Sequence, residues 1–142
     1  MNRIGSARIV LLGEATHGTS EFYRMRERIS RELIIKKGFR FISIEADWPD
    51  AARVDHYVRH FQYPPSEWTA FARFPTWMWR NNEVRDFVSW LRKYNDTVQR
   101  DQRVAFHGLD LYSCMIQSAR FSTTSTRSIR NLPRSLVSAV AA

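Results

Sequence analysis

The sequence predicts an α/β fold: a partial parallel sheet of about three strands with crossover helices, truncated from a larger domain. Two observations predict it. Short apolar runs, typical of buried strands, alternate with longer amphipathic segments, typical of helices. A strand, a helix and a second strand also follow one another closely near the start of the chain. This order is typical of a βαβ unit, in which the strands are parallel and the crossover is right-handed.

The first βαβ unit begins at residues 8–12, where the continuous apolar run RIVLL predicts a strand buried on both faces. The loop GEATHGTS follows, and its last residues are suited to cap a helix over about residues 20–37. Two lysines and then Gly38 are typical of a helix end. The second strand is predicted over residues 39–47 (FRFISIEAD).

Two further helices and one strand are expected after this unit. Pro49 stands where a first helical turn accepts proline, so the segment from residue 48 to 61 is predicted to be helical. Prolines break residues 63–77 into turns or one short helix. A second crossover helix is predicted over residues 81–95, and a third strand over residues 103–110. The helix presents an apolar stripe of Val84, Phe87, Val88 and Leu91.

The charge of the chain is unevenly distributed. The formal net charge is +8, and residues 114–142 contribute +4 of it through four arginines without any acid. This segment is also rich in serine and threonine, so we expect a domain over residues 1–113 and a basic tail over residues 114–142, either flexible or frame-shifted. In residues 1–113 the basic side chains are interleaved with acids, which argues against nucleic acid as a partner.

The remaining composition indicates a cytoplasmic globular protein. Hydrophobic residues make up 44% of the chain and aromatic residues 13%, as in proteins with a packed core. The sequence contains neither a secretory signal pattern nor an apolar run long enough for a membrane span, so we expect no membrane association. Cys114 is the single cysteine, which excludes a disulfide within the chain.

Charged side chains follow each predicted strand. Glu14 and His17 come just after the first strand, Glu45 and Asp47 end the second, and Asp110 ends the third. In a parallel α/β sheet, ligands bind at the carboxyl ends of the strands. We therefore expect these side chains to share one edge of the sheet and to form a site there.

The first helix supplies a further candidate. Arg26 falls within the predicted apolar stripe of that helix, and a buried arginine needs a carboxylate partner. Glu14 and Glu45 are the acids nearest to it in the predicted fold, so we expect one charge cluster of Arg26, Glu14 and Glu45 beside His17. A purely structural Arg26–Glu45 ion pair is the alternative. The stripe consists of Phe22, Met25, Ile29 and Leu33.

This cluster suits hydrolysis by activated water. A histidine takes a proton near neutral pH, a carboxylate orients its ring, and an arginine stabilises an oxyanion. The chain lacks a GxSxG motif, so a serine nucleophile is not expected. His17 could also be a loop histidine that caps a backbone group, and a metal site would need more ligands than this stretch provides. The other histidines, His56, His60 and His107, lack a comparable setting, and Trp77, Trp79 and Trp90 are more typical of a core.

Four stretches resemble consecutive blocks of the erythromycin esterase family: LLGEATHGTSEFYRMRERISRELI, SIEADWPDAARVDHYVR, FPTWMWRNNEVRDFVSWLRKYN and VAFHGLDLYS. The resemblance covers about residues 4–113. It implies an α/β fold and hydrolysis of a small-molecule ester or lactone, with macrolide antibiotics as the name-giving substrates and antibiotic resistance as the associated role. It also implies that His17 is the general base and that Glu14, Arg26 and Glu45 support it.

The same resemblance leaves the cofactor and the activity of this chain open. Family members hydrolyse esters with or without help from a metal. The resemblance therefore does not require a cofactor, and a divalent metal is the alternative. They also continue far beyond the block VAFHGLDLYS and supply a further histidine from there. We therefore expect a truncated enzyme that is inactive or nearly so and tends to aggregate through its last strand. The alternatives are a non-catalytic interaction module and, less in keeping with the charges, a nucleic-acid binder.

Overall fold

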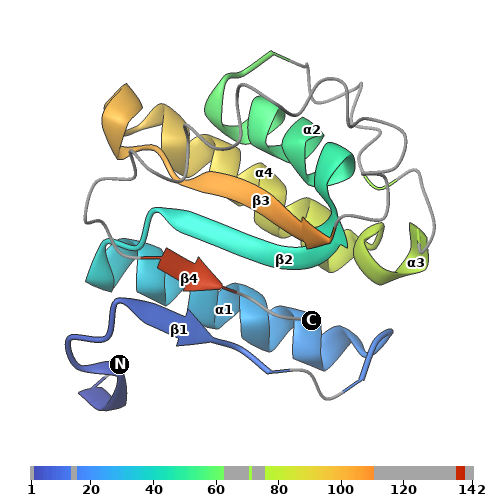
Figure 1. The fold of residues 1–142 in the computed structure, drawn as a ribbon, viewed down its shortest axis with the longest axis horizontal. Helices are drawn as coiled ribbons and strands as arrows, with labels where there is room; N and C mark the ends of the chain where they lie inside the picture. Colours follow the sequence, from blue (N-terminus) through green and yellow to red (C-terminus); the bar gives the residue numbers. More distant parts are fainter. Residues whose placement is uncertain (1, 14–15, 63–70, 72–75, 111–136, 140–142) are drawn as a thin grey trace.

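A computed structural model of the protein describes residues 2–13, 16–62, 71, 76–110 and 137–139 (Figure 1). Two 3₁₀ turns, Asn2–Ile4 and Arg100–Gln102, accompany the regular elements. Most of the predicted turns at residues 63–77 and most of the predicted tail lie outside the described residues. The helices are α1 (Ser20–Lys37), α2 (Trp48–Arg59), α3 (Thr76–Trp79) and α4 (Asn82–Asp96), and the strands are β1 (Ile9–Leu11), β2 (Phe41–Asp47), β3 (Ala105–Asp110) and β4 (Val137–Ala139).

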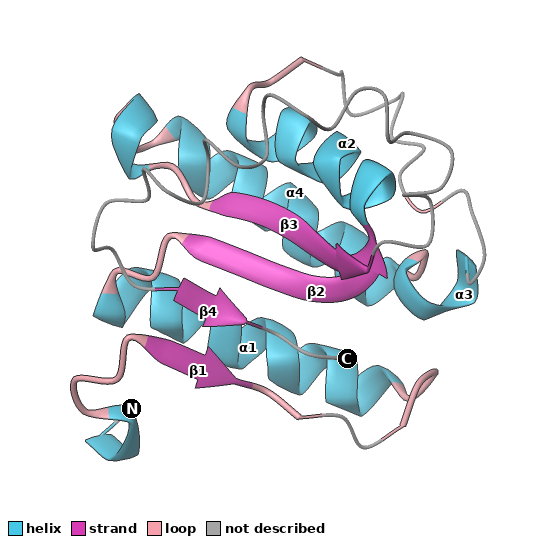
Figure 2. Ribbon diagram, viewed as in Figure 1, coloured by secondary structure: helices cyan, strands magenta, loops and turns pink. Residues whose placement is uncertain are grey.

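The strands form one parallel sheet in the order β1-β4-β2-β3 (Figure 2). Helix α1 connects β1 to β2, and α2 and α4 lie between β2 and β3 in the sequence, so the predicted α/β class and the predicted crossover helices are confirmed. Strand β4 pairs with both β1 and β2, and it comes from the segment assigned to the tail. The boundary predicted at residue 113 remains a prediction.

Helix α1 has the predicted bounds. Thr19 is its N-cap, and the Gly38 that follows it has a φ of 70°, a left-handed conformation that favours glycine and ends the helix. The predicted buried stripe is only partly correct, because Leu33 is buried while Phe22 and Met25 are 39% and 53% exposed. The buried face is rotated toward α4 and contains Tyr23, Ser30, Leu33 and Ile34.

Helix α4 confirms its predicted apolar stripe, since Val84, Phe87, Val88 and Leu91 are all buried. The side chain of Asn81 begins this helix by accepting a hydrogen bond from the Val84 amide at 2.9 Å. Asp47 and Pro49 begin α2 directly after β2, as the predicted first-turn proline implies. Both helices thereby face a core that includes Ile42, Ile44 and Phe106 of the sheet.

Strand β1 does not have the predicted burial on both faces. Ile9 and Leu11 are 60% and 70% exposed, so the strand presents apolar side chains to solvent. Its position explains the difference, because β1 is an edge strand that pairs only with β4 in the described sheet. In the part of the chain that the structure describes, no helix is both long and apolar enough to cross a membrane.

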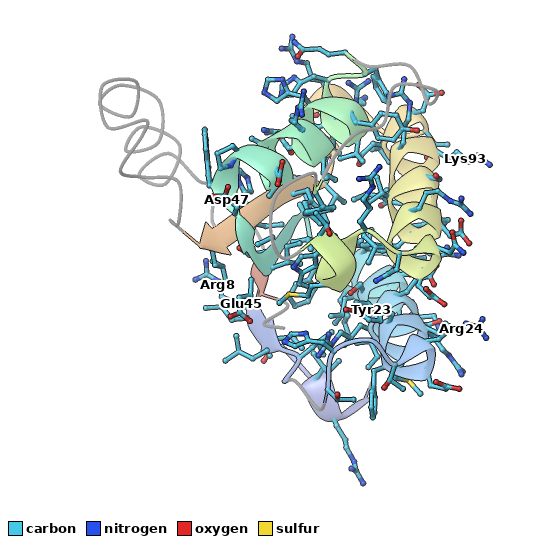
Figure 3. All side chains as sticks on the ribbon, turned by 90° about the vertical axis from the view of Figure 1, so that its right-hand side faces the viewer. Arg8, Tyr23, Arg24, Glu45, Asp47 and Lys93 are labelled. Carbon is cyan, nitrogen blue, oxygen red and sulfur yellow. The ribbon has the colours of Figure 1, made fainter. Side chains whose placement is uncertain are left out.

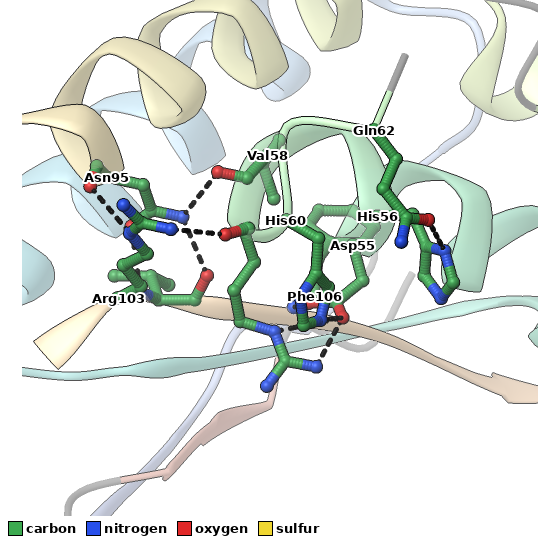
Figure 4. Close-up of polar contacts among 10 residues, drawn as sticks. Asp55, His56, Val58, His60, Gln62, Asn95, Arg103 and Phe106 are labelled. Atoms are coloured by element: carbon green, nitrogen blue, oxygen red, sulfur yellow. Dashed lines mark hydrogen bonds and ion pairs between the residues drawn. The ribbon is translucent and has the colours of Figure 1, made fainter. Parts of the chain in front are cut away.

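Two buried polar side chains join β3 to the helices (Figure 4). The Asn95 amide nitrogen donates to the carbonyl oxygens of Val58 and Val104, and the Asn95 side-chain oxygen accepts from the Val104 amide at 2.8 Å. The Asp55 carboxylate accepts from the Phe106 amide at 2.9 Å. These bonds satisfy backbone groups at the amino end of β3 that strand pairing leaves open.

Candidate active site

The carboxyl ends of the strands meet at one edge of the sheet, because all strand pairs are parallel. His17 lies in the loop between β1 and α1. Glu45 and Asp47 lie at the carboxyl end of β2, and Asp110 is the last residue of β3. We call this edge the carboxyl rim. The structure therefore places four of the five predicted rim residues there, and the fifth, Glu14, lies outside the described residues.

His17 is held close to the first turn of α1. The side chain is half-buried, and the carbonyl oxygen of His17 accepts a hydrogen bond from the Thr16 hydroxyl at 3.2 Å. Gly18 follows with a φ of 80°, which side chains with a Cβ rarely adopt. The glycine thus lets the chain turn from His17 directly into the helix.

Arg26 reaches back from α1 to the same loop. Its guanidinium nitrogen donates to the Gly13 carbonyl oxygen at 3.4 Å, and its Cζ lies 6.0 Å from the centre of the Tyr23 ring. Gly13 lies at the start of the loop that leads to His17, so the guanidinium lies beside the beginning of this loop. The helix therefore brings a positive charge to the carboxyl rim.

The predicted direct contact between Arg26 and Glu45 is not formed among the described residues. Ile44 and Ala46 are buried in the core while Glu45 is exposed, so the Glu45 carboxylate lies on the face of the sheet opposite to α1. Figure 3 shows Glu45 and Asp47 on one side of the molecule, with Arg24 of α1 on the other. Contact between Arg26 and Glu14 remains a prediction.

Trp79 makes a contact with the end of β2 that the sequence did not predict. The indole Nε1 donates to the Glu45 carbonyl oxygen at 2.8 Å. Trp79 is 5% exposed, as expected for a core residue, and the Tyr23 ring meets it edge-on at 6.2 Å. A buried indole N–H usually donates to a hydrogen-bond acceptor. The expectation that Trp79 belongs to the core therefore implied such an acceptor, although the sequence did not identify which one.

A small pocket lies between α1, α4 and the sheet. Its volume is about 40 Å³, and Tyr23, Arg26, Glu27 and Glu83 contribute to its lining. The Ser20 hydroxyl donates to the Glu83 carboxylate and lowers its pKa, with further help from backbone groups and Arg24. The pocket has room for a few water molecules only, whereas a drug-sized ligand needs roughly 300 Å³ or more. It therefore does not supply a substrate site by itself.

The other three histidines lie away from His17. His56 and His60 are near the carboxyl end of α2, where His56 contacts Gln62 and burial lowers the pKa of His60 (Figure 4). His107 lies in β3 and stacks on Phe41 with 4.6 Å between the ring centres. Burial lowers the pKa of His107, although Asp55 opposes this change. That these three histidines lack a functional role remains a prediction.

A metal is not accommodated by the described side chains. Within residues 2–13, 16–62, 71, 76–110 and 137–139, no group of three or more histidine, cysteine, aspartate or glutamate side chains is arranged to hold a metal ion. A protein zinc site normally uses at least three such ligands.

Comparison with known proteins identifies similar sequences. The family model described as erythromycin esterase matches residues 34–136. Erythromycin esterase type II of Escherichia coli is 28% identical over 108 residues, which cover 76% of this chain and 24% of that protein. Of the predicted site, Glu45 lies inside the range that the family model matches, and Glu14, His17 and Arg26 precede it.

Two solved structures resemble the chain. One, described as a succinoglycan biosynthesis protein, is 26% identical with a TM-score of 0.66 and covers 85% of this chain. The other, a protein from Bacillus cereus, is 32% identical with a TM-score of 0.66 and covers 91% of this chain. The chain spans 31% and 32% of these two proteins, so it corresponds to about a quarter to a third of the length of its relatives.

Proposed function

Because the chain belongs to the erythromycin esterase family, we propose that its carboxyl rim is part of a site that hydrolyses an ester or lactone. The contact between Arg26 and the Gly13 carbonyl supports this proposal most directly. It places a guanidinium against the loop that carries His17, so a base and an oxyanion-stabilising cation come from neighbouring elements. A macrolide lactone is the substrate class that the name of the family suggests.

In the proposed reaction, His17 takes a proton from a water molecule as the water oxygen attacks the carbonyl carbon of the substrate. The carbonyl double bond opens, and the resulting oxyanion is stabilised by Arg26. The tetrahedral intermediate then collapses, and the bond to the leaving alkoxide breaks. The proton passes from His17 to that oxygen, which yields a carboxylic acid and an alcohol.

The acidic residues have supporting roles in this proposal. Glu14 follows the glycine that Arg26 contacts, so we assign it to orient Arg26 or the His17 ring. Glu45 and Asp47 present carboxylates at the end of β2 and on the other face of the sheet from α1. We assign Glu45 to act on the rim through the bound substrate, without a direct bond to Arg26.

The proposal is tested by replacing His17 with asparagine in the gene within its source organism, so that the protein is assayed in the form that this organism makes. Purified protein is given a macrolide lactone and a simple aryl ester. Loss of a general base typically lowers the rate by about 10² to 10⁴-fold. The matched control is His56→Asn, because His56 is an exposed histidine near the carboxyl end of α2.

We expect the His17→Asn protein to fold with an unchanged circular dichroism spectrum and to lose hydrolysis, while His56→Asn retains it. Equal activity of wild type and His17→Asn on both substrates would refute the assignment of the base. A wild-type protein without measurable turnover of either substrate would refute the assignment of the reaction.

A further inference from the structure

We propose that Trp79 and Gly108 are positioning residues for Glu45: they hold the end of β2 in a bulged path that keeps the Glu45 carboxylate on the face of the sheet opposite to α1. The role of Glu45 at the site rests on the proposed function. The geometry that fixes its backbone does not, and it is tested separately.

The path of β2 departs from regular pairing between Ile44 and Asp47. The β2–β3 register is continuous from Phe41 opposite Ala105 to Ile44 opposite Gly108, and the next recorded pair is Asp47 with Asp110. Three steps along β2 therefore match two steps along β3, which means that β2 contains one extra residue at this point. Such bulges bend the strand and redirect a side chain, and they are common beside active sites.

Trp79 fixes this bulge from the side of the helices. The Glu45 carbonyl oxygen accepts the indole N–H of Trp79 at 2.8 Å, in a region where strand pairing is interrupted. The indole itself is immobilised, because it is 5% exposed and packs against the rings of Tyr23 and Phe71. The Tyr23 hydroxyl also donates to the carbonyl of Met78, the residue before Trp79. The hydrogen bond therefore joins Glu45 to a rigid part of the core.

Gly108 fixes the bulge from the side of β3. A Cβ at position 108 would lie 2.3 Å from the Ala46 carbonyl oxygen and 3.1 Å from both the Asp47 carbonyl oxygen and the Ala51 Cβ. The first distance is far below any tolerated contact, and the neighbour is backbone, which cannot rotate away. The close approach of Ala46 to β3 thus requires glycine for reasons of space.

The consequence for Glu45 follows from the alternation of side chains along a strand. Ile44 and Ala46 point into the core while Glu45 is exposed on the other face. A shift of the pairing by one residue would exchange the two faces. Glu45 would then turn toward α1 and α4, and a buried residue would take its place. Holding the bulge therefore maintains the position of the carboxylate.

The test compares Trp79→Phe with Trp90→Phe in the whole chain. Both changes replace an indole by a smaller ring, and Trp90 stacks between Phe87 and Tyr94 of α4, away from the end of β2. The side-chain carboxyl resonance of Glu45 is followed by ¹³C NMR. We expect Trp79→Phe to shift this resonance and Trp90→Phe to leave it unchanged. In the protein in the form that its organism makes, Trp79→Phe should lower the kcat of hydrolysis by about 10 to 100-fold with a nearly constant KM, because the change misplaces a group without removing substrate contacts.

Two further measurements test the same geometry without Trp79→Phe, in case that variant does not fold. In the unaltered chain, the Trp79 indole N–H should exchange with solvent much more slowly than that of free tryptophan. In Gly108→Ala, the Glu45 resonance should shift as it does in Trp79→Phe. Fast indole exchange, or an unshifted Glu45 resonance in both variants, would overturn the proposal. A shifted resonance in a protein that hydrolyses no ester would uphold the positioning geometry and refute the proposed function.

Discussion

Replacing Asn95 by alanine should strongly destabilise the fold, because this side chain joins three elements. Asn95 belongs to α4, is 0% exposed, and makes hydrogen bonds to Val58 of α2 and to Val104, which precedes β3. The substitution leaves the Val58 carbonyl and both backbone groups of Val104 without this partner. Water cannot easily replace it, since Val58 and Val104 are also fully buried.

The expected cost can be worked from these contacts. Three hydrogen bonds are lost, and each contributes about 1 kcal/mol on average. A buried backbone group left without a partner costs about 1–3 kcal/mol, so the sum of about 3 kcal/mol for the three bonds is a lower limit here. We therefore expect Asn95→Ala to lower the free energy of unfolding by about 3–5 kcal/mol. This is a large share of the roughly 5–15 kcal/mol that stabilises an ordinary domain.

Urea unfolding, followed by tryptophan fluorescence, measures this change. With a slope of about 2 kcal/mol per M, the midpoint should fall by about 1.5–2.5 M. Lys93→Ala is the matched control, because Lys93 is exposed on the same helix and should change stability by less than about 0.5 kcal/mol. A loss below about 1 kcal/mol in Asn95→Ala would show that its three hydrogen bonds do not hold α2, α4 and β3 together.

Two other predictions concern charged and titrating side chains. Arg26→Met should change the free energy of unfolding by less than about 1 kcal/mol, because Arg26 is only half-buried and its hydrogen bond to the Gly13 carbonyl oxygen is a long one of 3.4 Å. The substitution should nevertheless reduce ester hydrolysis, and a large loss of stability in urea would assign Arg26 a structural role instead. Burial lowers the pKa of His107 below the value of about 6.5 that holds in an unfolded chain. The unfolded state therefore binds the proton more readily, and the free energy of unfolding should decrease as the pH falls below about 6.5. His107→Gln should flatten the change in urea midpoint between about pH 7 and pH 5, and an unchanged pH dependence would contradict this assignment.

Local sequence signals predicted the helices well. Gly38 after two lysines fixed the end of α1, and the spacing of Val84, Phe87, Val88 and Leu91 identified the buried face of α4. These signals depend on residues close in sequence, so they can be recognised without knowledge of the fold. The rotation of α1 could not be recognised in this way, because it depends on Tyr23 reaching Met78 and Trp79 of a distant segment.

The sheet and the site were predicted only in outline. The sequence predicted three strands and their common rim, but not the pairing of β4 between β1 and β2, because strand order depends on contacts between distant segments. It also predicted that Arg26 and Glu45 would meet, and the described residues do not form this contact. The bulge at the end of β2 has no pattern in the sequence, because it depends on the register with β3. The exposed side of Glu45 does have one: apolar and polar residues alternate from Ile42 to Asp47, which places Glu45 on the face opposite to Ile44. The glycine at position 108, within a predicted strand, is a signal of a close backbone approach that the sequence interpretation did not use.

Chemical rescue of His17 tests the central claim most directly. His17→Ala protein, produced from the gene within its source organism, is assayed for ester hydrolysis with and without added imidazole. If His17 is the base that activates water, the substitution should lower the rate by about 10² to 10⁴-fold, and imidazole should restore part of it in proportion to its unprotonated fraction. Substitution of alanine for the exposed His56 should leave the rate unchanged and insensitive to imidazole. Undiminished hydrolysis by the His17→Ala protein would contradict the account.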